Sequence, residues 1–193
     1  MRKVHWLSAA LGLVGLSWAT PSFADGPATE GALQIGLGFR YGAELNDGDF
    51  NPWGTGIGLE VGYTLPVLPI YVGGNAEYFF GNKVDFGGTP TMASSSVESH
   101  IWQVTAEGGY DFGVGDHLVI RPKLGLGFAN PSAEVCGGGL PCQKNSDTKG
   151  LVTPGAKIIL MFSRFQLSFD GRYAVVLSDP TAKAFIFSVG IGF

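Results

Sequence analysis

Large apolar side chains alternate with small or polar ones along much of this chain, and the alternation is clearest in residues 184–193. Successive side chains of a β-strand point to opposite faces, so a period of two predicts a strand with one apolar face. The opposite face of this segment is mostly small, with Ser188, Gly190 and Gly192. The large apolar face, which suits contact with lipid, carries Phe185, Phe187, Val189, Ile191 and Phe193.

The same alternation divides the chain into eight segments of about ten residues, the length that a tilted transmembrane strand needs. One apolar face in each of eight strands predicts an all-β fold, an eight-stranded antiparallel up-and-down barrel whose closure leaves no sheet edge in hydrocarbon. Pro122 and Pro154 fall inside two segments and cannot donate ladder hydrogen bonds, so we expect bulges or strand ends there. The predicted strands are 31–41, 55–65, 70–80, 98–111, 118–129, 151–161, 165–175 and 184–193.

The connections between these strands alternate between tight and long. Tight turns at 66–69, 113–117 and 162–164 separate long loops at 42–54, 81–97 and 130–150, and the last loop, near 178–182, is short. Bacterial outer-membrane barrels place short turns in the periplasm and longer loops outside the cell. The pattern therefore predicts that both termini are periplasmic.

A soluble lipocalin-like barrel would also alternate, so the two faces must be compared. The apolar face carries aromatic residues near both strand ends, for example Tyr41 and Trp102 at the loop end and Tyr110 and Phe165 at the turn end. Two such bands are typical of the girdles at the two lipid–water interfaces. The other face carries charges and many of the 31 glycines, which are unsuited to a dry ligand pocket. The sequence therefore predicts lipid outside and polar groups inside.

The N-terminus predicts export. Arg2 and Lys3 precede an apolar run at 7–19, and Ser22-Phe23-Ala24 is a small-x-Ala cleavage site, the arrangement of a secretory signal peptide. A membrane-spanning helix is the alternative, but the run is shorter than the roughly 20 residues required. We expect a signal peptide at 1–24 and a barrel domain at 25–193. The net charge of −4 becomes more negative without Arg2 and Lys3, which argues against a nucleic-acid partner.

Strand parity places nine charged residues in the lumen, and acids and bases nearly balance. An eight-stranded barrel is just wide enough for side chains to fill it, and buried charges there must be paired. We expect a salt-bridge network that plugs the barrel; the alternative is a charge-selective pore, although selectivity filters usually carry one sign. The nine residues are Arg40, Glu60, Glu77, Glu107, Arg121, Lys123, Lys157, Asp170 and Arg172.

The signal peptide, the eight strands, the ionic lumen and the terminal Phe193 together resemble the small eight-stranded outer-membrane barrels typified by the OmpA transmembrane domain and OmpX. The resemblance implies a place in the outer membrane of a Gram-negative bacterium, in contact with its lipid and lipopolysaccharide. It also implies that periplasmic chaperones and the barrel assembly machinery handle the chain. In that family the terminal aromatic strand is the assembly signal, which corresponds here to Phe185, Phe187, Val189, Ile191 and Phe193.

Cys136 and Cys142 lie in the longest predicted loop, and in an exported protein such a pair predicts a disulfide. A metal site is the alternative, but no histidine lies nearby. Some small outer-membrane barrels are lipid A-modifying enzymes, which need a histidine with a serine and a carboxylate. His100 follows Glu98 and Ser99, yet neighbouring residues of a strand face opposite sides, so we expect no catalytic site, no metal and no cofactor.

The sequence therefore predicts a non-enzymatic barrel with a plugged lumen that acts in envelope structure or surface interaction through its long loops. A narrow pore for ions or small solutes is the first alternative, and a lipid A-modifying enzyme is the second. Loops on a rigid scaffold are where binding usually resides, but these loop sequences identify no ligand.

Overall fold

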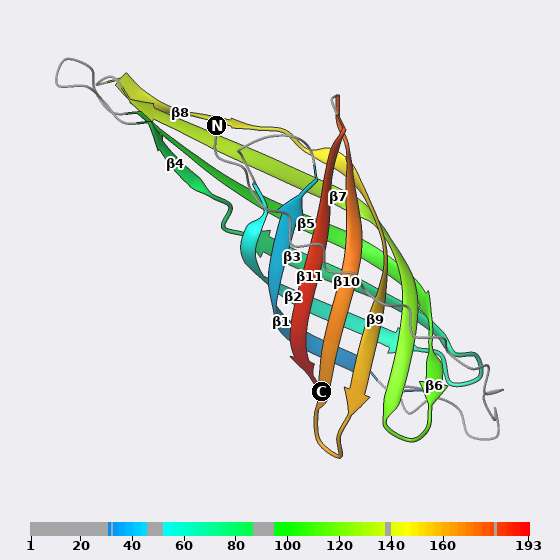
Figure 1. Cartoon of the computed structure of the whole chain (residues 1–193). Coiled ribbons are helices and arrows are strands. Elements are labelled where there is room, and N and C mark those ends of the chain that lie inside the picture. The colour runs from blue at the N-terminus through cyan, green and yellow to red at the C-terminus, as the bar shows by residue number, and fades with distance from the viewer. Residues whose placement is uncertain (1–30, 32, 46–51, 87–94, 138–139, 180) are drawn as a thin grey trace.

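The computed structural model describes residues 31, 33–45, 52–86, 95–137, 140–179 and 181–193, and these form a single antiparallel β-sheet (Figure 1). Eight long strands enclose the barrel: β1 (Leu33–Glu44), β2 (Gly54–Thr64), β3 (Ile70–Phe79), β5 (Ser95–Tyr110), β7 (Leu118–Gly137), β9 (Lys149–Met161), β10 (Gln166–Leu177) and β11 (Ala182–Gly192). Three short strands extend the sheet: β4 (Lys83–Phe86), β6 (Phe112–Val114) and β8 (Leu140–Ser146). The predicted signal peptide at 1–24 lies outside the described residues.

The barrel closes because β1 pairs with β2 on one side and with β11 on the other, in a register that runs from Gly36–Gly192 to Glu44–Ala184. The eight long strands follow one another around the ring in chain order, and every pairing is antiparallel. The predicted all-β, eight-stranded up-and-down barrel is therefore confirmed. None of the described residues belongs to a helix long and apolar enough to cross a membrane.

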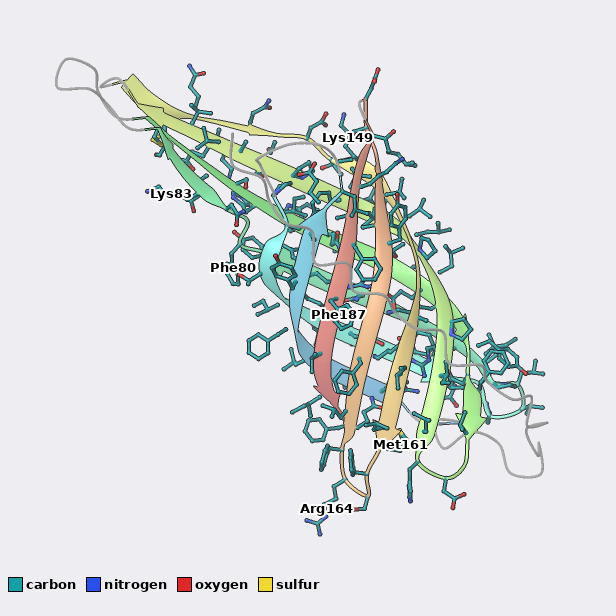
Figure 2. The ribbon with its side chains drawn as sticks, viewed as in Figure 1. Phe80, Lys83, Lys149, Met161, Arg164 and Phe187 are labelled. Atoms are coloured by element: carbon teal, nitrogen blue, oxygen red, sulfur yellow. A yellow bond between two sulfur atoms is a disulfide. The ribbon has the colours of Figure 1, made fainter. Side chains whose placement is uncertain are left out.

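Exposure alternates along the strands as the sequence pattern predicts. On β1, Phe39 is 77% exposed whereas the adjacent Arg40 is buried, and Leu37 and Tyr41 share the outer face. Figure 2 shows apolar side chains such as Phe187 around the wall, with Lys83 and Lys149 towards one end and Met161 and Arg164 at the other. We call the end with Lys149 the loop end and the end with Arg164 the turn end.

Pro122 and Pro154 lie inside continuous strands, which corrects the expectation of bulges or strand ends. Each proline keeps its partner on one side, Ala156 for Pro122 and Leu124 for Pro154. On the other side the pairing is missing at the proline and resumes beyond it in the same register. A proline lacks only its own N–H, so the ladder loses a local bond without a shift of the strand.

Two of the predicted long loops contain regular strand structure, which is a second correction. Within 81–97 lie β4 and the start of β5, and within 130–150 lie the end of β7, β8 and the start of β9. These pieces pair in the order β4-β5-β7-β8. They extend beyond the other strands at the loop end (Figure 1), and we call β4, residues 95–100, residues 130–137 and β8 the projecting sheet.

Candidate functional site

The interior of the barrel is the most chemically distinctive part of the molecule. All nine charged residues assigned to the lumen by strand parity are buried there. A tenth buried charge, Asp111, was not predicted; it is 2% exposed and directly follows β5. Its inward direction follows from that of Glu107, since residues four apart in a strand share a face. With Asp111 the lumen carries five acids and five bases, which we call the ionic network.

At the level nearest the loop end, the network is centred on Glu77. Its Oε1 accepts hydrogen bonds from Arg40 Nε and Arg172 Nη2, each at 2.5 Å. Asn75 Nδ2 also donates to this oxygen at 3.2 Å, and Gln103 Nε2 donates to the other oxygen. One carboxylate therefore joins β1, β5 and β10 to β3.

The middle level contains three acids of the network, Glu60, Glu107 and Asp170. Lys123 bridges Glu107, at 2.9 Å, and Asp170. Arg172 Nε lies 2.9 Å from Asp170 Oδ1, which ties this level to the one above. Across the lumen, Lys157 Nζ donates to both carboxylate oxygens of Glu60 at 2.7 Å, and these residues are 97 positions apart in the chain.

At the turn end, Arg121 and Asp111 form a fully buried pair, with Arg121 Nε 2.5 Å from Asp111 Oδ1. The guanidinium also donates to Gln34 Oε1 at 3.0 Å and lies 3.6 Å from the ring centre of Tyr71. Tyr71 of β3 lies over the adjacent strand β2 so closely that a Cβ at Gly62 would be 2.2 Å from its hydroxyl oxygen. Its own hydroxyl donates to Glu60 at 3.1 Å, which ties the turn end to the Glu60–Lys157 pair of the middle level.

Among the eight long strands, β11 contributes no charged side chain to the ionic network. Small inward residues line the lumen on its side, where a cavity of about 10 Å³ remains beside Glu60, Asp170 and Ser188. A cavity of this size has room for about one water molecule.

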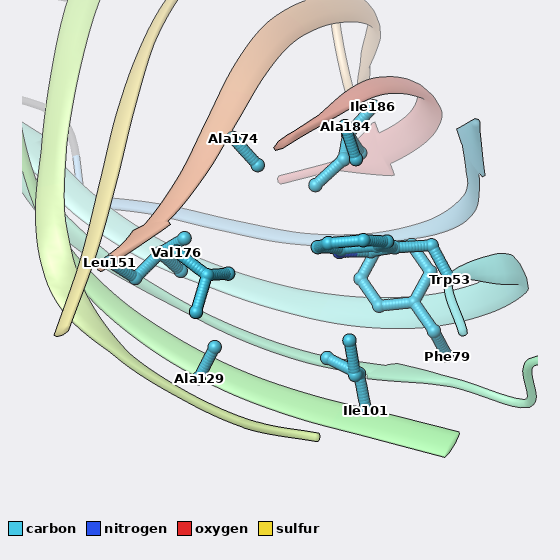
Figure 3. Close-up of a cluster of buried hydrophobic side chains, with 9 residues drawn as sticks. All are labelled: Trp53, Phe79, Ile101, Ala129, Leu151, Ala174, Val176, Ala184 and Ile186. Carbon is cyan, nitrogen blue, oxygen red and sulfur yellow. The ribbon is translucent and has the colours of Figure 1, made fainter. Parts of the chain in front are cut away.

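The loop end of the lumen is different in kind, because buried apolar side chains gather there (Figure 3). Trp53, which directly precedes β2, is fully buried there. It lies against β1 so closely that a Cβ at Gly42 would be 2.5 Å from Trp53 Cβ. We call this group the apolar layer: Trp53, Phe79, Ile101, Ala129, Leu151, Ala174, Val176, Ala184 and Ile186.

The apolar layer was not predicted, although the sequence carries a signal for it. Inward positions of several strands change from polar to apolar as they approach the loop end. On β10, Asp170 and Arg172 are followed on the same face by Ala174 and Val176. Trp53 carried no such signal, since it lies in a segment predicted as loop.

The predicted disulfide between Cys136 and Cys142 is present, and it links β7 to β8 near the tip of the projecting sheet. Glu134 completes the one group of three potential metal ligands among the described residues, but both sulfurs of that group form the disulfide. Nearby, the exposed Asp147 pairs with Lys149, and the hydrogen bond from Lys149 lowers the pKa of Asp147 below its usual range.

One face of the projecting sheet carries a row of four charges. In register across the strands lie Lys83 of β4, Glu98 of β5, Glu134 of β7 and Lys144 of β8. The row has no net charge. The outer edges of β4 and β8 have no strand partner within the described part of the sheet.

His100, Ser99 and Glu98 do not assemble into a catalytic group. Ser99 is buried and its hydroxyl donates to the carbonyl of Asn82, whereas the His100 ring stacks on Tyr78 with centroids 5.8 Å apart.

The terminal strand presents its large residues outward, with Phe193 77% exposed, as the alternation in the sequence requires. The outward residues are Phe185, Phe187, Val189, Ile191 and Phe193.

A closed antiparallel ring with an apolar outer wall and a charged interior defines a transmembrane β-barrel. The chain belongs to the family of outer membrane protein beta-barrel domains, which matches residues 7–193, and its place is the outer membrane. The search among curated proteins finds no match.

Three solved structures share this fold. Ail, the attachment invasion locus protein of Yersinia pestis, in complex with the heparin analogue sucrose octasulfate, has a TM-score of 0.55 at 19% identity, covering 83% of this chain and 96% of Ail. Neisserial surface protein A has a TM-score of 0.51 at 14% identity, covering 83% and 94%. A major outer membrane protein from Thermus thermophilus has a TM-score of 0.62 at 11% identity, covering 84% and 99%.

Proposed function

We propose that this chain is a non-enzymatic outer-membrane barrel with a closed lumen, which acts in surface interaction through its projecting sheet. The observation that carries the proposal is the sheet itself, which continues past the apolar layer in four strands. It ends in two edges, and strand edges are a common docking surface for other protein segments. Both termini are then periplasmic, with the projecting sheet outside the cell.

Two groups of buried side chains support the closed lumen, namely the ionic network and the apolar layer. The test is single-channel conductance of the refolded mature protein in a planar bilayer, beside Trp53→Ala and Lys157→Ala. We expect no discrete openings from the parent protein. Openings of the parent protein that change with Lys157→Ala would overturn the closed lumen in favour of a narrow pore.

The row of four charges on the projecting sheet indicates which class of ligand this surface could bind. Ail is described in complex with a heparin analogue, and binding of a sulfated sugar calls for unpaired basic groups. Here each lysine of the row faces a glutamate, so we propose an uncharged protein surface as the ligand. Sucrose octasulfate is the probe: we expect no saturable binding to the refolded protein, and tight binding would contradict this ligand class.

Surface interaction is tested by replacing residues 133–145 with an Asn-Gly turn and measuring adhesion of bacteria that produce the protein. The barrel should still fold, because the replaced segment lies outside the ring, and adhesion should fall to the level of cells without the protein. Lys144→Gln is the matched control, and bacteria that produce this variant should still adhere. Unchanged adhesion after the replacement would contradict the role of the projecting sheet.

Absence of enzymatic activity is supported by the separation of Ser99 and His100 onto opposite faces of β5. Mass spectrometry of lipid A from producing cells tests it. We expect an unchanged lipid A profile with the parent protein and with His100→Ala. A modified lipid A that disappears with His100→Ala would establish an enzyme instead.

We also propose the course of biogenesis. Cleavage after Ala24 leaves 25–193 as the mature chain, which an intact mass of the membrane protein would check. Chaperones and the assembly machinery then handle the chain through the outward residues of β11 and Phe193. Deletion of Phe193 should reduce the amount of folded protein in the outer membrane, while lipid and lipopolysaccharide surround the wall in either case.

A further inference from the structure

The turn between β2 and β3, residues 65–70, has an unusual surface for a connection at the turn end of a barrel. Its sequence is Leu-Pro-Val-Leu-Pro-Ile, without a single polar side chain. Val67 is 86% exposed and Leu68 is 53% exposed, and Leu65 and Ile70 are also exposed. Apolar side chains exposed together in this way indicate a contact with an apolar partner. We call residues 65–70 the apolar turn.

Part of the backbone of the apolar turn is satisfied within the protein. Pro66 and Pro69 have no N–H group to satisfy. Leu65 N donates to Ile70 O at 3.0 Å, Ile70 N donates to Leu68 O at 2.6 Å, and Pro69 O accepts from the backbone N of Asp111 at 2.7 Å. A segment that enters a lipid environment needs its backbone groups satisfied within the protein. These bonds satisfy two of the four N–H groups and three of the six carbonyl groups of the apolar turn, which is half of that requirement.

The surface of the apolar turn is continuous with the lipid-facing wall. Tyr63 and Val72 are paired below it, and Ile70 is paired with Tyr110, whose ring lies 4.7 Å from that of Phe112. No charged residue interrupts this path. The other two connections at the turn end differ, because 113–117 exposes Asp116 and His117 and 162–164 exposes Arg164.

We propose that the apolar turn inserts into the lipid leaflet around the turn end, with Val67 and Leu68 at the boundary between headgroups and acyl chains. Apolar surfaces of this kind bury themselves about 5–10 Å into that boundary. The turn then fixes the depth of the barrel on one side of its circumference, while the polar turns remain in water. This interaction with lipid is separate from the surface function of the projecting sheet.

Depth-dependent fluorescence quenching tests the proposal. The two cysteines of the chain form the disulfide, so Val67→Cys supplies one reactive thiol for an environment-sensitive NBD label. Asp116→Cys on a polar turn is the matched control, and Leu68→Cys is a second reporter in the apolar turn. Each labelled mature protein is refolded into phosphatidylcholine–phosphatidylglycerol vesicles, and quenching by aqueous iodide is compared with quenching by lipids that carry a spin label near the glycerol.

We expect the labels at 67 and 68 to be quenched by the spin-labelled lipid, and iodide to quench them severalfold less than the label at 116. Equal iodide quenching at 67, 68 and 116 would overturn the proposal. Protection from iodide without quenching by the lipid would also overturn it, because that result means contact between copies of the protein. Folding of each variant is verified by the heat-dependent shift in electrophoretic mobility before labels are compared.

Discussion

The two ends of the lumen are filled in opposite ways, although the same strands line both. Towards the turn end and through the middle, ten charged side chains form the ionic network, whereas the apolar layer occupies the loop end. On β10 the change takes place between Arg172 and Ala174, which are adjacent positions on one face. An inward face of a small barrel can therefore be polar or apolar, provided that its charges are paired or its apolar side chains are packed.

The ionic network and the apolar layer are stabilised by different interactions. Each charge of the ionic network needs its partners, because an uncompensated buried charge is strongly destabilising. The apolar layer needs only close packing of its side chains. The two groups are adjacent on the barrel wall, where Ile186 of the apolar layer is paired with Arg172 of the ionic network. Apolar surroundings have a low dielectric constant, which strengthens neighbouring ion pairs.

The largest effect should come from removing the centre of the ionic network. Glu77→Ala leaves Arg40 and Arg172 without the carboxylate that both contact. We expect the free energy of unfolding to fall by about 3–5 kcal/mol. Urea unfolding of the protein refolded in vesicles measures this loss. Glu98→Ala on the exposed face of the projecting sheet is the control, with a change within about 0.5 kcal/mol; similar losses in both variants would refute the distinction.

A smaller loss should follow from opening a cavity in the apolar layer. Ile186→Ala removes a fully buried side chain, and we expect a loss of about 2–4 kcal/mol in the same assay. Ile191→Ala changes the same residue type on the lipid-facing side of the same strand. The free energy of unfolding of Ile191→Ala should fall clearly less, because lipid can fill the space that the side chain leaves. Equal losses would mean that the apolar layer is not close-packed.

One ion pair of the ionic network can be replaced by apolar residues, which makes that part of the lumen resemble the apolar layer. Replacing Glu60 and Lys157 together, as Glu60→Leu with Lys157→Met, removes both charges of one pair. We expect a net change within about 1 kcal/mol, because well-packed apolar residues often substitute for a buried pair without loss. Lys157→Met alone should cost about 3 kcal/mol, because Glu60 is then left unpaired. A double variant as unstable as the single one would show that this pair is indispensable.

The smallest effect is expected at an ion pair outside the barrel. The hydrogen bond from Lys149 lowers the pKa of Asp147, so any stabilisation is present above the ordinary carboxyl pKa and is lost as the pH falls through the lowered value. The pair is exposed, and exposed pairs contribute little. Asp147→Asn should leave the unfolding midpoint unchanged at neutral pH and at acid pH. A destabilisation that disappears on acidification would contradict this expectation.

The ring and much of its interior could be predicted from the sequence, because the period of two fixes both the strand and the face of each side chain. The directions of Lys157 and Arg172 followed from that parity alone. Asp111 was missed because it lies at a strand boundary, where a pattern is least defined. Trp53 and the projecting sheet were missed for another reason: glycine, serine and asparagine indicate loops locally, and only tertiary packing and strand pairing override that tendency.

The cross-lumen ion pairs have a kinetic consequence. Arg172 and Glu77 are 95 positions apart, and Lys157 and Glu60 are 97 apart, so neither pair can form until distant strands come together in the ring. Interactions that form after the transition state for folding slow unfolding and leave the folding rate almost unchanged. We therefore expect these pairs to form late in folding and to set how long a completed barrel persists before it unfolds.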